Sequence, residues 1–202
     1  MRPVLIKITG VVAALAAGTA ASAQTIEAAY TTLETDKCPH ARGWASEDYG
    51  HWTCKGYGGI AVWVAGGDQR VYVSFGPRAK NEPAASQTFS SFNSEGRTIE
   101  WRIERGRDGK ARPFATILRW NTAPVDENDN QIRGQVLVVT RLAPGPVCHV
   151  GYVDGRANAN ANELARAIAD KHARSFRCAT DRPIVLGQKG PGFSPPRGSD
   201  PD

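Results

Sequence analysis

Two cysteines and two histidines lie close together in this sequence, in segments 38–40 (CPH) and 51–54 (HWTC). Thiolates and imidazoles are the ligands of tetrahedral zinc sites, so the segments suggest a metal centre. The spacing differs from that of common zinc fingers, because a single residue separates Cys38 from His40. In an oxidising compartment the thiols of Cys38 and Cys54 would instead join as a disulfide. We therefore predict a disulfide here and no bound metal.

A second pair of cysteines, Cys148 and Cys178, lies in the C-terminal third of the chain. His149 could activate Cys148 as a nucleophile, but adjacent residues of a strand point to opposite faces. Four cysteines allow three pairings, and we favour the sequential one, Cys38 with Cys54 and Cys148 with Cys178. The alternative to a disulfide-stabilised binding domain is a hydrolase or metal-dependent enzyme that uses His40, His51 or His149.

Four aromatic residues crowd the first cysteine loop, namely Trp44, Tyr49, Trp52 and Tyr57. Such rings can stack against a sugar or anchor a protein contact. They can equally cover a small disulfide loop that has few aliphatic residues. We take these four residues as the candidate binding residues, and exposure of the tryptophans would favour binding over local packing.

An export signal is predicted at the N-terminus. Residues 1–23 hold Arg2 and Lys7, an apolar stretch over 8–17, and small residues at 21–23 (ASA) that are typical of a cleavage site. We expect cleavage after this site and a periplasmic or secreted location, where disulfides persist. Because the apolar stretch is too short to cross a bilayer comfortably, no integral membrane span is expected.

Charge and missing motifs narrow the function classes. The formal net charge of +5 falls to +3 once the two signal-peptide cations are removed, which is too little to require a nucleic-acid partner. The sequence has no serine-nucleophile elbow, zincin motif, phosphate loop or dinucleotide fingerprint. We therefore expect no cofactor and no catalytic residue. The pattern favours a non-enzymatic domain that binds an unknown protein or a component of the cell envelope.

Alternating apolar and polar residues predict strands from about residue 25 to 154. In 98–104 (TIEWRIE), the apolar residues share one face and the charged residues share the other, which we expect to face water. Glycine and aspartate at 66–68 and 107–110 suit tight antiparallel hairpins. The predicted fold class is α+β, an antiparallel sheet of about six to eight strands with one C-terminal helix packed on it.

That helix is predicted after Asn160, where Glu163 follows at capping-box spacing and apolar residues recur on one stripe. It completes a single α+β domain over residues 24–181. Residues 182–202 are rich in proline and glycine, which is typical of a disordered tail.

Five segments together resemble a family of small, uncharacterised exported bacterial proteins. They are 54–59 (CKGYGG), 71–76 (VYVSFG), 115–120 (ATILRW), 148–154 (CHVGYVD) and 162–165 (NELA). The resemblance covers most of the chain after the signal peptide. It implies an exported single domain, and it implies no catalytic or binding residue.

Overall fold

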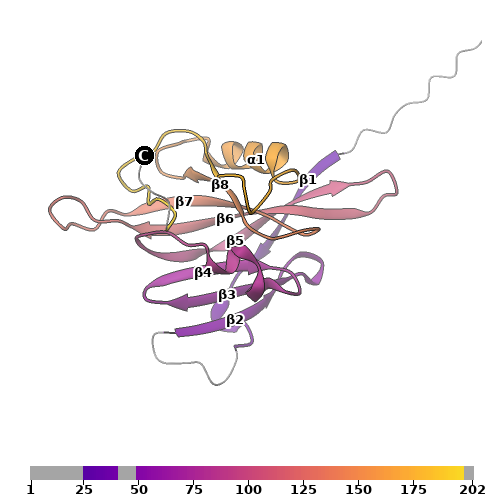
Figure 1. Ribbon diagram of the computed structural model, residues 1–202, viewed down its shortest axis with the longest axis horizontal. Coiled ribbons are helices and arrows are strands. Elements are labelled where there is room, and N and C mark those ends of the chain that lie inside the picture. The colour runs from indigo at the N-terminus through magenta and orange to yellow at the C-terminus, as the bar shows by residue number, and fades with distance from the viewer. Residues whose placement is uncertain (1–24, 41–48, 198–202) are drawn as a thin grey trace, which may run out of the picture.

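The computed structural model describes residues 25–40 and 49–197 and shows three layers (Figure 1). The predicted signal peptide lies outside these residues. A six-stranded sheet forms the middle layer, a three-stranded sheet covers one of its faces, and one helix covers the other. The bounds of the elements are β1 Thr25–Thr32, β2 Tyr49–Lys55, β3 Ala61–Gly67, β4 Arg70–Phe75, β5 Phe92–Arg105, β6 Ala111–Ala123, β7 Gly134–Arg141, β8 His149–Asp154, α1 Ala161–His172 and β9 Ile184–Val185.

The predicted α+β class is confirmed, but the strands divide between two sheets. The larger sheet has the order β1-β5-β6-β7-β8-β9, and the smaller has the order β2-β3-β4. All neighbouring strands are antiparallel except β8 and β9, which are parallel. Alternation within each strand predicts one buried face, and two separate sheets can satisfy that requirement by burying their apolar faces against each other.

The core between the sheets is built around large rings. Trp101 and Trp120 are completely buried, and the Phe75 ring meets Trp101 edge-on with 5.6 Å between centroids. The indole N–H of Trp101 donates to the hydroxyl of Thr31 at 2.8 Å, so this ring is buried without an unsatisfied donor. The predicted inward face of 98–104 is confirmed, since Ile99, Trp101 and Ile103 all lie in this core.

The opposite face of the same strand departs from the prediction. Glu100 and Arg102 were expected to face water, yet both are buried. Arg102 makes two hydrogen bonds to Asp170 of α1, at 2.9 and 2.7 Å, and these bonds raise the pKa of its guanidinium. The Glu100 carboxylate is bound by Arg102 and by Arg166 of α1. The charged face is therefore covered by charges of opposite sign on the helix.

Small residues let α1 approach the sheet closely. Ala165 and Ala169 are completely buried on the stripe that the sequence predicts, beside Ile168. The predicted capping box is absent, because the Asn160 side chain makes no capping hydrogen bond. The first turn is closed instead by the Asn160 carbonyl, which accepts from the backbone N–H groups of Glu163 and Leu164. Packing against the sheet thus stabilises this helix more than its cap does.

Both predicted disulfides are confirmed. Cys38 is bonded to Cys54 of β2, and Cys148 is bonded to Cys178, with Cα–Cα distances of 5.0 and 5.8 Å. The second bond joins the segment before β8 to the chain that follows α1. In the entropic account, each bond stabilises the fold by roughly 3–4 kcal/mol by restricting the unfolded chain.

Residues 182–197 lie against the domain, whereas their composition favours disorder. β9 pairs with β8, and the carbonyl of Gly192 accepts a 3.0 Å hydrogen bond from Thr122 of β6. Gly134 and Gly192 meet so closely that a side chain at Gly134 would overlap the Gly192 carbonyl. Glycines that suggest disorder in the sequence therefore permit close backbone contact in the structure.

Candidate functional site

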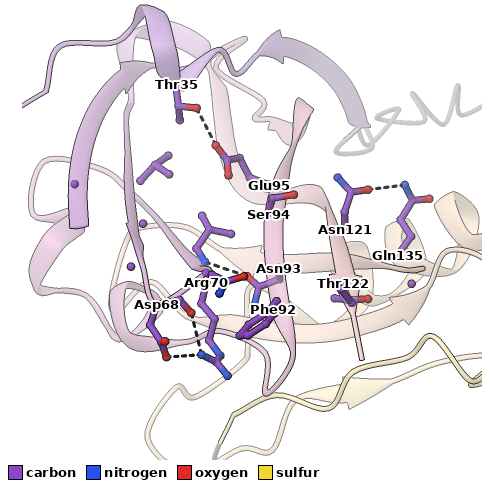
Figure 2. A pocket seen from close by; sticks show the side chains of 18 of the residues that line it. Thr35, Asp68, Arg70, Phe92, Asn93, Ser94, Glu95, Asn121, Thr122 and Gln135 are labelled. Atoms are coloured by element: carbon purple, nitrogen blue, oxygen red, sulfur yellow. Dashed lines mark hydrogen bonds and ion pairs between the residues drawn. The ribbon is translucent and has the colours of Figure 1, made fainter. Parts of the chain in front are cut away.

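A groove of about 1200 Å³ opens between the two sheets, where the β3–β4 turn faces the first residues of β5 (Figure 2). It lies where chain segments meet that are far apart in the sequence. The side chains that line it include aromatic, amide, hydroxyl, carboxylate and guanidinium groups. They include Thr35, His40, Trp52, Asp68, Arg70, Asn93, Glu95, Asn121, Arg133, Gln135 and Arg156.

Trp52 supplies an aromatic surface to the groove. It lies on β2, where Gly50 precedes it by two residues and Gly66 of β3 pairs with Gly50. A Cβ at Gly50 would lie 2.9 Å from the Trp52 ring, and one at Gly66 would lie 3.6 Å away. The half-buried ring therefore lies over glycine backbone and also packs against the inter-sheet core.

Asn93 ties the smaller sheet to the start of β5. Its side-chain oxygen accepts from the backbone N–H of Val71 at 3.0 Å, and its own backbone N–H donates to the Gln69 carbonyl at 3.0 Å. β4 and β5 belong to different sheets, so these bonds fix the width of the groove at this end. Two residues further along β5, the Glu95 carboxylate accepts a 2.9 Å hydrogen bond from the Thr35 hydroxyl.

The β3–β4 turn has an unusual backbone. Asp68 and Gln69 have φ angles of 51° and 54°, a left-handed conformation that glycine and asparagine adopt more readily. Arg70 then bonds the Asp68 carboxylate at 2.5 Å and the Ser90 carbonyl at 2.8 Å. Positive φ at both central residues suits a two-residue hairpin, and this turn holds a guanidinium and a carboxylate at the groove rim.

The rim also carries cations without acidic partners. Within residues 25–40 and 49–197, no carboxylate lies within ion-pair distance of Arg133 or Arg156. Asp68 and Arg70 neutralise each other, and Glu95 is the remaining carboxylate of the lining. The groove is therefore polar and mildly cationic, and Trp52 and Phe92 supply aromatic surface to it.

Of the four candidate binding residues, Trp52 and Tyr57 have different surroundings. Trp52 lines the groove, as a binding role requires. Tyr57 is half-buried against the inter-sheet core, with its ring 6.3 Å from that of Trp101. Tyr49 begins β2, where its backbone pairs with Gly67, and Trp44 lies outside the described residues. Their binding role stays a prediction, with Trp52 as the residue best placed for it.

The three histidines of the alternative enzyme hypothesis occupy different environments. His40 is exposed and pairs with Trp52 through a β-bridge, while His51 is half-buried with its ring 6.3 Å from Trp63. His149 is buried in the inter-sheet core, where its Nδ1 lies 3.0 Å from the Tyr152 hydroxyl. Burial lowers the pKa of His149 to about 3. In the described part of the chain, no three His, Cys, Asp or Glu side chains gather as a metal site would require.

Sequence reasoning missed most of the groove. The hairpin at 66–68 was predicted, but nothing in its pattern places it opposite Asn93 and Glu95. A polar stretch at the start of a long strand was the available signal, since Ser94 and its neighbours break the apolar alternation.

Comparison with known proteins gives no relative: no protein-family model, curated protein or solved structure matches this chain. Across the described residues, no helix has the length and apolar character needed to cross a lipid bilayer.

Proposed function

We propose that this protein is an exported, disulfide-stabilised domain of the periplasm or the secreted fraction that binds an oligosaccharide of the cell envelope without catalysis. The two disulfides support an oxidising location. The resemblance to small exported bacterial proteins agrees with that location, and we propose membership of this family. The ligand site is the groove between the sheets.

The position of Trp52 carries this proposal. Sugar rings present a C–H face that packs on an aromatic ring, and they carry hydroxyls that need planar hydrogen-bonding groups around them. The groove supplies both requirements, because Trp52, Asn93, Glu95, Asn121 and Gln135 all line it.

The volume of the groove also suits an oligosaccharide. Pockets for drug-sized ligands measure about 300–1,000 Å³, so a groove of about 1200 Å³ can accommodate several sugar residues. Arg133 and Arg156 would favour a glycan with acidic substituents, since neither cation has a carboxylate partner among the described residues.

Isothermal titration of the mature chain, residues 24–202, tests the proposal. The probes are hexasaccharides of glucose, of N-acetylglucosamine and of galacturonic acid. Trp52→Ala removes the indole ring from the groove, and Trp63→Ala is its matched control, because Trp63 is a half-buried tryptophan of the same sheet that does not line the groove.

We expect at least one hexasaccharide to bind, with affinity lowered tenfold or more by Trp52→Ala and unchanged by Trp63→Ala. Failure of all three probes, or equal binding by Trp52→Ala, would overturn the proposal. Near-ultraviolet circular dichroism of both variants shows whether the fold is retained.

A further inference from the structure

A second cavity, of about 500 Å³, lies on the helix side of the six-stranded sheet, beside the first turn of α1. It is separate from the groove, although Gln135 lines both. The residues that line it come from four strands (β1, β5, β6 and β7) and the helix, and three of them are arginines. They are Tyr30, Gly96, Arg97, Thr98, Glu100, Ile117, Arg119, Gln135, Asn162 and Arg166.

Arg119 is the cation of this cavity that has no carboxylate. Its guanidinium donates to the side-chain oxygens of Gln135 at 2.6 Å and Asn162 at 2.8 Å, both of them neutral amides. Partial burial lowers the pKa of Arg119 below its ordinary value. Three of its five N–H groups have no partner among the described residues, so the side chain retains capacity for an anion.

The other charges around the cavity are already paired. Arg166 bonds Glu100 at 2.7 Å and also donates to the Tyr30 hydroxyl at 3.1 Å. Arg97 is an exposed residue that pairs with Glu34. Glu100 also receives a bond from Arg102. Among the described residues, Arg119 is therefore the arginine of this cavity that has no carboxylate partner, while Arg97 shares Glu34 with Lys37.

A bulge in β5 shapes the space above this charge. Glu95 pairs with Trp120, and the next pair is Ile99 with Leu118, so residues 96–98 of β5 stand opposite Arg119 alone. A Cβ at Gly96 would lie 2.5 Å from the Arg119 carbonyl, which only glycine avoids. Bulges commonly bend a strand next to a binding site, and this one lies at the wall of the cavity.

We propose that this cavity binds the carboxylate of a small monoanionic ligand through Arg119, with the Asn162 side chain as a second polar contact. A carboxylate matches the planar fork of the one guanidinium of the cavity that has no carboxylate partner among the described residues. A phosphate monoester carries closer to two negative charges, and the second would lie near the Glu100 carboxylate, which also lines the cavity. Arg119, the cation of this site, does not line the groove.

Side-chain NMR of the mature chain provides the test, with glucuronate as the probe and glucose and inorganic phosphate as comparisons. The Nε–Hε resonance of Arg119 and the amide resonances of Asn162 report directly on the cavity. Arg119→Gln removes the charge, and Arg112→Gln is the control, because Arg112 is an exposed arginine of the same strand paired with Asp108 outside the cavity.

Saturable shifts of the Arg119 and Asn162 signals with glucuronate are expected, with none from glucose and weaker ones from phosphate. Arg119→Gln should weaken glucuronate binding at least tenfold while Arg112→Gln leaves it unchanged, and the backbone amide spectrum of each variant checks its fold. If Arg119→Gln does not fold, the titration of the wild-type protein with glucuronate still tests the proposal. The proposal fails if glucuronate gives no saturable shift, if phosphate binds as tightly, or if Arg112→Gln causes the same loss.

Discussion

The six-stranded sheet meets the three-stranded sheet through large rings, whereas it meets α1 through alanines and paired charges. Trp101 and Trp120 fill the first interface, and Ala165 and Ala169 allow close approach at the second. Rings hold two sheets about 10 Å apart, so the space stays open where the ring packing ends. On the helix side, a cavity lies beside the paired charges at Arg119, whose hydrogen bonds go to neutral amides. The two faces thus produce two kinds of candidate binding site.

The largest expected difference between the two interfaces is in how much their packed side chains contribute to the free energy of unfolding. Trp101→Ala should lower the free energy of unfolding by about 3–5 kcal/mol, because it leaves a large cavity between the sheets. Ile168→Val removes one methylene under α1 and should cost about 0.5–1.5 kcal/mol. Urea denaturation measures both values. Equal losses for the two variants would contradict a core that depends chiefly on its rings.

A pH effect of intermediate size belongs to the ring-filled interface. His149 has a pKa of about 3 when folded and about 6.5 when unfolded, so unfolded chains bind a proton between these values that folded chains do not. Stability should be full above pH 6.5 and decline as the pH falls toward 3, by up to about 1.4 kcal/mol per pH unit.

Chemical denaturation between pH 7 and pH 4 measures this slope. His149→Gln should remove it, whereas His172→Gln, at an exposed histidine of α1, should retain it. Carboxylates such as Asp108 and Asp126, whose pKa values are lowered by hydrogen bonds, contribute at lower pH in every variant. A slope that persists in His149→Gln would assign the effect to other groups.

The smallest of the three effects concerns the charged interface. Arg102→Met should cost about 2 kcal/mol, because it removes buried hydrogen bonds to Asp170 and Glu100. Arg105→Met removes a cation from the same strand whose pair with Glu27 is about half exposed, so it should cost at most ~1 kcal/mol. Thermal denaturation of both variants compares the two losses of stability. A larger loss for Arg105→Met than for Arg102→Met would show that α1 does not depend on its charges.

The sequence predicted what depends on local pattern. Alternation placed Ile99, Trp101 and Ile103 in a core, and cysteine spacing with the export signal predicted both disulfides. The same alternation placed Glu100 in water, because no local pattern shows that a helix more than sixty residues later covers it.

The groove was not predictable for a related reason. Trp52 was a candidate from its residue type, but Asn93 and Glu95 join it only because β4 and β5 meet across two sheets. Strand periodicity gives the face of each residue and says nothing about which strands end at the same place. The cavity at Arg119 depends in addition on a bulge, which the sequence marks only by Gly96.

Mapping of backbone amide shifts during titration with the tightest-binding hexasaccharide tests the central claim most directly. Oligosaccharide binding in the groove predicts saturable shifts at Trp52, Gly66 and Asn93, with no shifts in the middle of α1 around Ile168. Shifts confined to the helix side of the sheet, or no saturable shifts with any of the three hexasaccharides, would contradict it.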